Sequence, residues 1–397
     1  MIYERPKYKN QYENFIGGEC IAPSSGEYIE NISPVDGKLL TKIPRSNEKD
    51  VDLAVEAAKK GFEEFKHTSV TQRSALLNKI ADIVEANLET LAVAETLDNG
   101  KAVRETLNAD LPLFIDHFRY FASVIRAESG TISDLDENTI SQEIYEPYGV
   151  VAQIIPWNFP LLMAAWKLAP AIAAGNCVVL KPASSTPLSI LLFLDLIKDV
   201  LPKGVINVVN GAGGKIGKHL VTHRDVKKVA FTGETSTGQE IMRYATENII
   251  PSTLELGGKS PNVFFKSIMD ADDEFFDKAI EGLVLFAFNS GEVCTCPSRA
   301  LIEESIYEPF MKRVIERVKA IKLGNPLDTE NTMGAQNSFN QKEKIAKYLK
   351  IAKEDGAECL VGGDIYHSSV NPDGFYIEPT IYKGHNKMRI FQEEIFG

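Results

Sequence analysis

The chain has 397 residues, 44% of them hydrophobic, which is enough for two or three lobes with sizeable cores. A formal net charge of −12 argues against nucleic acid or an anionic membrane surface as the main partner. No apolar run approaches the length of a membrane span, the N-terminal residues lack a signal-peptide core, and five scattered cysteines are too few for a disulfide framework. We therefore expect a cytoplasmic protein.

The first predicted elements are helices over residues 46–125, where apolar residues recur at helical spacing. Residues 139–148 form a predicted extended segment. From residue 149 onward strands alternate with helices, which predicts a parallel sheet covered on both faces. The predicted strands cover residues 150–155, 177–180, 205–209, 228–231 and 253–256.

A second α/β lobe is predicted after residue 261. Its predicted helices cover residues 273–288, 305–321 and 340–355, and its predicted strands cover residues 299–302 and 374–382. A cleft between two such lobes is a usual location for a ligand site.

The start of this second lobe holds the strongest candidate for a nucleophile, Cys294. It lies in FNSGEVCTCPSR (288–299), among small and flexible residues that follow an apolar run. A thiolate attacks carbonyl carbon well once local charges or amide dipoles lower its pKa from about 8.5. A lone cysteine is more often a buried structural residue, so the interpretation depends on partners elsewhere in the chain.

Two segments of the first lobe supply such partners. Glu255 lies between two leucines in LELGGKSP (254–261), on a predicted buried strand, where apolar neighbours would raise its pKa and suit it to act as a general base. The alternative is a carboxylate paired with Lys259. Asn158 lies in IIPWNFP (154–160), where a rigidly held amide can donate to an oxyanion, although Asn is also a common turn residue.

Two glycine-rich stretches follow predicted strands. GAGGKIG (211–217) opens a helix as a dinucleotide loop does, but its spacing departs from the usual fingerprint. GETSTG (233–238) has the glycine spacing of a phosphate loop, and a helix starting near Thr235 can direct amide N–H groups at a pyrophosphate. The pair Cys294 and Cys296 lacks the further ligands of a zinc site, so we predict no metal.

These motifs resemble the aldehyde dehydrogenase superfamily. PWNFP (156–160), KP (181–182), FTG (231–233), LELGGKSP (254–261), GEVC (291–294) and EEIFG (393–397) have that family's order and spacing, so the resemblance covers nearly the whole chain. It looks most like the bacterial acetaldehyde and short-chain aliphatic aldehyde dehydrogenases. The resemblance implies an α/β fold, in which a Rossmann-type parallel-sheet NAD(P)-binding domain is joined to a second α/β catalytic domain.

The resemblance also implies an organisation for the chain. Residues 1–131 and 149–256 would form the NAD(P)-binding domain, residues 132–148 an oligomerisation segment, and residues 257–397 the catalytic domain. Homologues continue past the EEIFG motif, so we expect a catalytic domain that is truncated at its C-terminal end. A homodimer or homotetramer is expected for the full-length form.

The cofactor implied is NAD, with NADP as the alternative because Ser184 occupies a position where many NAD-using relatives carry glutamate. Lys181 would bond the adenosine ribose, and Glu234 is typical of a subgroup with acetaldehyde-type activity. The residues implied to bind the cofactor are Ile154, Ile155, Pro156, Trp157, Lys181, Ser184, Gly213, Phe231, Thr232, Gly233, Glu234, Gly238, Leu256, Gly257, Glu394 and Phe396.

The reaction implied is the oxidation of a small aliphatic aldehyde to its acid through a thioester on Cys294. Asn158 would hold the oxyanion and Glu255 would activate water. The residues implied to line the substrate pocket are Phe159, Met163, Trp166, Val293 and Thr295. The alternatives are a coenzyme A-acylating or ester-cleaving enzyme, and an inactive fragment that binds dinucleotide or pairs with an intact subunit.

Overall fold

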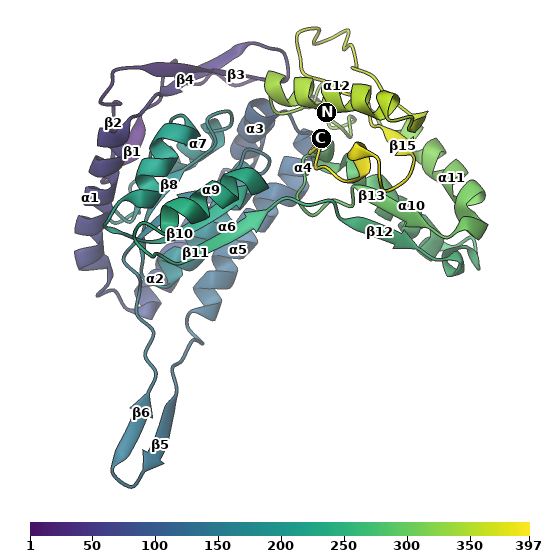
Figure 1. Ribbon diagram of the computed structural model, residues 1–397. Coiled ribbons are helices and arrows are strands. Elements are labelled where there is room, and N and C mark those ends of the chain that lie inside the picture. The colour runs from purple at the N-terminus through teal and green to yellow at the C-terminus, as the bar shows by residue number, and fades with distance from the viewer.

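The computed structural model describes residues 1–397, which form two lobes joined where the chain leaves β11 (Ser252–Leu256) for β12 (Pro261–Phe264) (Figure 1). The first lobe holds a seven-stranded sheet in the order β11-β10-β7-β8-β9-β1-β2. Its parallel strands are β7 (Val150–Ile154), β8 (Cys177–Lys181), β9 (Ile206–Val208), β10 (Val226–Gly233) and β11, and β1 (Asn14–Ile16) and β2 (Glu19–Ile21) complete it in antiparallel pairing. The predicted parallel sheet is confirmed.

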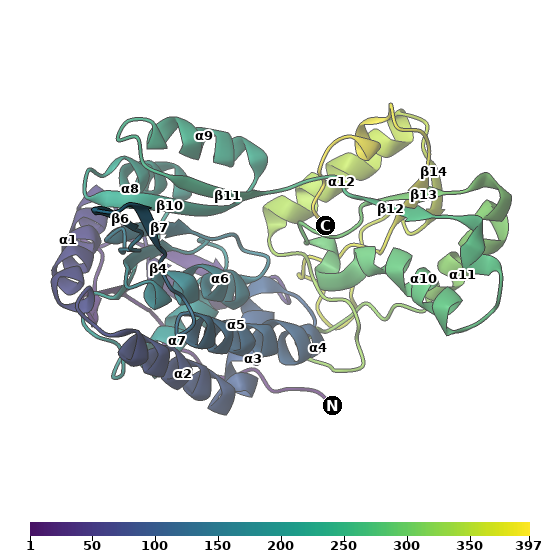
Figure 2. The same cartoon turned by 90° about the horizontal axis from the view of Figure 1, so that it is seen from below.

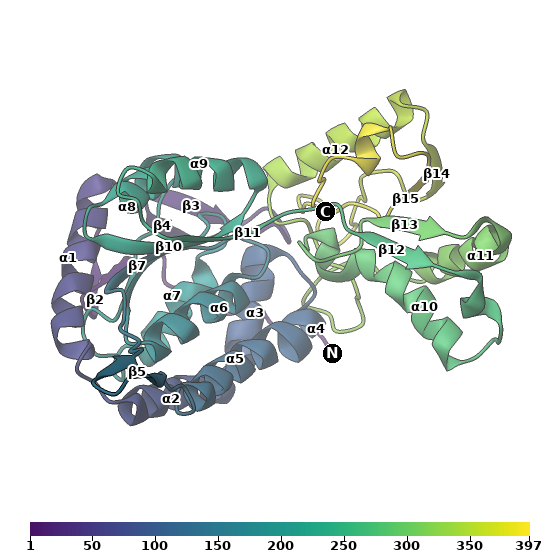
Figure 3. The same cartoon turned by 60° about the horizontal axis from the view of Figure 1, so that its bottom comes forward.

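Helices cover both faces of this sheet (Figure 2). One face carries α1 (Glu48–Phe65), α8 (Lys218–Thr222) and α9 (Thr235–Ala245), and the other carries α2 (Val70–Ala86), α3 (Leu88–Asn99), α5 (Leu111–Val124), α6 (Pro160–Ala173) and α7 (Leu188–Ile197), an arrangement also visible in Figure 3. The predicted helical region begins with a capping box at Asn47, and Gly100, at φ 97°, ends α3 because a left-handed residue cannot continue the helix.

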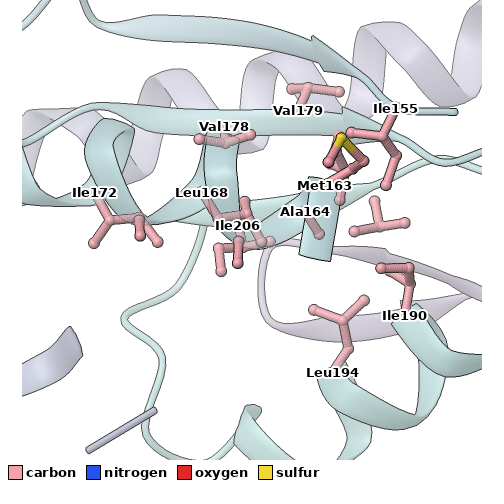
Figure 4. Packing of buried hydrophobic residues seen from close by; sticks show 14 of the residues in the cluster. Ile155, Met163, Ala164, Leu168, Ile172, Val178, Val179, Ile190, Leu194 and Ile206 are labelled. Carbon is pink, nitrogen blue, oxygen red and sulfur yellow. The ribbon is translucent and has the colours of Figure 1, made fainter. Parts of the chain in front are cut away.

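The core of this lobe is a cluster of 53 buried residues. Strands β7 and β8 are buried along their whole length, as parallel strands with helices on both faces should be. Figure 4 shows part of this core, where apolar side chains of α6 and α7 meet those of β8 and β9. No helix is long and apolar enough to cross a membrane.

A hairpin of β5 (Ile132–Asp136) and β6 (Thr139–Gln142) extends away from the lobe (Figure 1). Every residue of both strands is exposed. Of the extended segment predicted over residues 139–148, only residues 139–142 form a strand. A second hairpin, β3 (Tyr28–Ile32) with β4 (Leu39–Pro44), was not predicted.

The second lobe contains two small sheets and three helices. β12 pairs in parallel with β13 (Arg299–Ile302), β14 (Glu358–Val361) pairs antiparallel with β15 (Ile381–Lys383), and the helices are α10 (Glu274–Val284), α11 (Tyr307–Lys319) and α12 (Phe339–Glu354). The helix predicted over residues 273–288 ends at Val284, where a 3₁₀ segment (Leu285–Gly291) begins, and the backbone leaves helical geometry within that segment at residues 288–290. The strand predicted over residues 374–382 is limited to its last residues, since Pro379 lacks the N–H that a ladder needs.

Candidate active site

A cavity of about 500 Å³ lies where the two lobes meet, and it contains all three residues predicted for catalysis. Asn158 comes from the loop between β7 and α6, Glu255 from β11, and Cys294 from the loop before β13. These positions are distant in sequence, so the topology brings them to one site.

The loop that carries Cys294 has an unusual backbone. Asn289 and Ser290 have φ of 51° and 56°, and Gly291 has φ of 80°. Non-glycine residues in this region store strain, which persists only where the surroundings hold the chain. Burial raises the pKa of the half-buried Cys294 thiol, while the backbone N–H groups of Cys294 and Thr295 lower it. The pKa as a whole lies above that of a free thiol.

Asn158 is buried and held at both its side chain and its backbone. Its Nδ2 donates to the backbone oxygen of Glu292 at 2.8 Å. Its own backbone oxygen accepts from Lys101 Nζ at 2.6 Å and from Asn289 Nδ2 at 3.1 Å. The amide is thus fixed against the cysteine loop, with one N–H of its NH₂ group directed at Glu292.

The prediction that Glu255 lies on a buried strand is wrong. Its strand, β11, is an edge strand that pairs only with β10, and the side chains of Thr253 and Glu255 are exposed while Leu254 and Leu256 are half-buried. Alternation along the strand directs the carboxylate away from α9. The alternative pairing of Glu255 with Lys259 is also not formed, since the charged groups that act on Lys259 are Arg299 and Glu394.

A lysine that sequence reasoning missed lies beside this group. Lys167 on α6 is buried, and its Nζ donates to Thr232 Oγ1 at 2.5 Å. Burial lowers its pKa to about 8, against the opposing effect of Glu255 and Cys294. In the sequence, Lys167 could have been recognised as a charged residue within an otherwise apolar helix.

The turn from β10 to α9 forms another wall of the cavity. Gly233 and Glu234 line it, and no side chain caps the first turn of α9. Gly238 packs so closely on β11 that an added Cβ would lie 2.5 Å from Leu256 Cδ2. A larger residue at this position would require the Leu256 side chain to shift.

The C-terminal residues and α12 close the remaining side. Glu394 Oε1 accepts from the backbone N–H of Gly258 at 3.2 Å, and the Phe396 ring contacts Trp157 edge-on at 5.2 Å between centroids. Gln341 and Lys344 of α12 also line the cavity, and no local pattern in the sequence marks them.

The predicted residues do not all line this cavity. Those that do, besides the catalytic three, are Pro156, Trp157, Met163, Thr232, Gly233, Glu234, Leu256, Gly257, Glu394 and Phe396. Those outside its walls are Ile154, Ile155, Phe159, Trp166, Lys181, Ser184, Gly213, Phe231, Gly238, Val293 and Thr295. Trp166 and Phe231 instead line a neighbouring cavity of about 1070 Å³, which shares Glu255 with the first.

Lys181 is buried rather than free at the end of its strand. Its Nζ donates to the backbone oxygen of Pro182 at 2.8 Å, and burial lowers its pKa to about 8. Gly213 lies next to it, with an added Cβ 3.8 Å from Lys181 Cε. Lys181 and Gly213 therefore lie side by side at the end of β8.

A doubly covered parallel sheet beside a cleft with a cysteine, an amide and a carboxylate is typical of a dinucleotide-dependent oxidoreductase. Residues 21–397 match the model of the aldehyde dehydrogenase family, and the chain belongs to this family. The predicted family and fold class are confirmed.

Proteins similar to this chain in sequence are also aldehyde dehydrogenases. The long-chain-aldehyde dehydrogenase of Acinetobacter sp is 63% identical over 390 residues, which are 98% of this chain and 77% of the relative. Acetaldehyde dehydrogenase 2 of Cupriavidus necator is 59% identical, again over 98% of this chain and 77% of the relative. The chain is thus an oxidoreductase whose relatives differ in the aldehyde they are named for.

Solved structures agree in fold. An indole-3-acetaldehyde dehydrogenase in complex with NAD⁺ has a TM-score of 0.94 at 40% identity, over 98% of this chain and 79% of that one. The NAD⁺ complex of an aldehyde dehydrogenase from Bacillus cereus has a TM-score of 0.94 at 36% identity, over 100% of this chain and 80% of that one. NAD⁺ is the cofactor in both, in agreement with the prediction.

Proposed function

We propose that this chain oxidises a small aliphatic aldehyde to the carboxylic acid, with NAD as the hydride acceptor and a thioester on Cys294 as the intermediate. The observation that carries the proposal is the single cavity that holds Cys294, Asn158 and Glu255 beside the uncapped first turn of α9. One aldehyde, one NAD⁺ and one water give one acid, one NADH and one proton.

The residues present fit a dinucleotide. The unpaired N–H groups at the start of α9 favour a pyrophosphate, and the close packing of Gly238 on Leu256 keeps this helix end against the sheet. Thr232 and Gly233 would line the phosphate side, while Trp157, Glu394 and Phe396 would surround the nicotinamide end. NAD, when bound there, supplies the hydride acceptor.

The chain's own groups would carry the other steps. The Cys294 thiolate adds to the carbonyl carbon, and the Asn158 NH₂ donates to the oxyanion, a contribution commonly worth about 3–4 kcal/mol. Loss of hydride from the same carbon leaves the thioester. Glu255 then takes a proton from water, which attacks the acyl carbon and releases the acid from Cys294.

Lys167 would support the base. Its amino group lies near enough to Glu255 and Cys294 for both to oppose the lowering of its pKa by burial. The fixed hydrogen bond to Thr232 keeps this amino group in place. A lysine whose pKa is about 8 can also pass a proton between the site and solvent.

The proposed organisation follows the resemblance. Residues 1–131 and 149–256 would bind the cofactor, residues 257–397 would carry the nucleophile, and residues 132–148 would join subunits. The protein would work in a reducing compartment. Exposed fractions of 66% for Ile132, 68% for Leu135 and 62% for Ile140 support subunit contact through the hairpin. An isolated two-stranded hairpin is marginally stable in water, so a partner surface would stabilise it.

The acyl intermediate provides the test. Protein mixed with NAD and acetaldehyde is quenched with acid, and the peptide containing Cys294 is analysed by mass spectrometry. We expect an acetyl adduct on Cys294 that increases in Glu255→Gln, because hydrolysis is slowed after acylation. Parallel samples with a long-chain aldehyde would show which chain length acylates faster. An adduct that is no more abundant in Glu255→Gln would contradict the role given to Glu255, and the absence of any adduct would contradict the proposed reaction.

A further inference from the structure

Behind the cavity lies a buried group of ionisable side chains that no step of the proposed reaction uses. It consists of Glu95, Lys101, Glu105, Asp110 and Glu292, each at most 8% exposed. They come from the end of α3, the short helix α4 (Val103–Glu105), the π-helical turn after it, and the cysteine loop. A π turn of this kind is frequent at functional sites.

Two of these side chains hold the strained cysteine loop. Glu105 Oε1 accepts from the backbone N–H of Asn289 at 3.0 Å, although the two residues are 184 positions apart. Glu292 Oε1 accepts from the backbone N–H of Asn337 at 2.9 Å. Asn289 is one of the residues with positive φ, so the contact from Glu105 is made at a point that would otherwise relax.

The same loop holds the proposed oxyanion donor. Asn289 Nδ2 donates both to the backbone oxygen of Asn158 and to that of Glu292, each at 3.1 Å. The backbone oxygen of Glu292 in turn accepts from Asn158 Nδ2. A displacement of residues 289–292 would therefore move the Asn158 amide and the Cys294 thiol relative to each other.

We propose that Glu105 and Glu292 are positioning residues, which fix the cysteine loop so that the thiol of Cys294 and the amide of Asn158 keep a constant relative position. This inference rests on the catalytic roles proposed above for Cys294 and Asn158. Neither glutamate lines the cavity, so Glu105 acts through the backbone of Asn289 and Glu292 through the backbone of Asn337. A misplacement of about 1 Å in such an arrangement can lower the rate about 100-fold.

The protonation of the group agrees with this role. Burial raises the pKa of Glu105 to about 8 and that of Glu292 well above its ordinary value, with Lys101 opposing the shift in each case. Asp110, also buried, and Arg104 are the other charged groups that act on Glu105. Each glutamate has a second oxygen, Oε2, without a hydrogen-bond partner, so only Oε1 of each carboxyl holds the loop. A glutamine keeps an oxygen acceptor at this position.

The test compares isosteric with truncating variants. In Glu105→Gln the acceptor for the Asn289 N–H is kept, whereas in Glu105→Ala it is lost. The readout is the rate of alkylation of Cys294 by iodoacetamide as a function of pH, followed on the Cys294 peptide, together with kcat and the KM for NAD. Asp98→Ala is the matched control, because Asp98 is equally buried but binds Asn31 and the N–H of Leu188 instead of the loop.

We expect Glu105→Ala to lower both the alkylation rate near neutral pH and kcat about tenfold or more with an unchanged KM for NAD, while Glu105→Gln stays within about threefold of wild type. Asp98→Ala should lower the melting temperature without changing either rate. The proposal is overturned if folded Glu105→Ala alkylates like wild type, or if Glu105→Gln is as impaired as Glu105→Ala. Should Glu105→Ala not fold, the pair Glu292→Gln and Glu292→Ala makes the same comparison at the other anchor. Alkylation does not need turnover, so it decides the positioning role even if wild type forms no reduced nicotinamide.

Discussion

Replacement of Lys101 by methionine should destabilise the first lobe strongly. Lys101 Nζ lies 2.7 Å from Asp110 Oδ2, with the two side chains 0% and 1% exposed, and 4.0 Å from the centroid of the Phe159 ring. Removal of one partner from a buried ion pair costs about 3–5 kcal/mol, because the other charge is left uncompensated. Burial already raises the pKa of Asp110, so this carboxyl can take up a proton and the loss should fall near 3 kcal/mol.

The assay is thermal unfolding followed by circular dichroism. A loss near 3 kcal/mol corresponds to a lowering of the melting temperature by roughly 6–12 °C for a lobe of this size. The double variant Lys101→Met, Asp110→Leu should lose less than Lys101→Met alone, since the Asp110 carboxyl that has lost its partner is removed as well. Lys278→Met is the control, because the pair of Lys278 with Glu274 is exposed and should contribute less than about 1 kcal/mol. A loss below about 1 kcal/mol in Lys101→Met, or a double variant less stable than the single one, would refute this reasoning.

Three other predictions concern stability, packing and assembly. Burial raises the pKa of Asp98 to about 7, so between pH 4 and pH 7 the folded state holds a proton that the unfolded state has lost, and the free energy of unfolding falls as pH rises. Asp98→Asn should flatten this decline in denaturant titrations at several pH values. An unchanged dependence on pH would contradict the raised pKa of Asp98. Gly238→Ala should lower the free energy of unfolding by about 1–3 kcal/mol and weaken NAD binding measured by calorimetry, because its Cβ would overlap the Leu256 side chain. Addition of Leu256→Ala should restore part of the binding. A Gly238→Ala protein as stable as wild type would argue against the tight contact. Ile140→Asp on the hairpin should shift the protein to a smaller species in size-exclusion chromatography with light scattering, whereas an identical mass would exclude the hairpin from the subunit interface.

Periodicity in the sequence predicted the parts of the fold that local interactions determine. The strands β7, β8, β10 and β11 and the helices between them lie close to their predicted positions, because buried apolar runs and capping residues act over a few residues. The three catalytic candidates were predicted from their local surroundings, and they do line one cavity.

Other features depend on the order of strands and on distant contacts. Glu255 is exposed because β11 lies at the edge of the sheet. The residues of β11 themselves do not indicate where the strand lies in the sheet. The contact of Glu105 with Asn289 joins two lobes, and a glutamate at position 105 reads in sequence as an ordinary helix residue. The part that α12 plays in the cavity was missed for the same reason.

The most direct test of the proposed function is the formation of reduced nicotinamide from acetaldehyde and NAD by the purified chain, followed by absorbance beside Cys294→Ala. Lys278→Met, altered only on the surface, serves as the control for handling. We expect steady formation of NADH by wild type and by Lys278→Met, and none above background by Cys294→Ala. NADH formed equally well by Cys294→Ala, or none formed by wild-type protein that binds NAD, would contradict the proposed function.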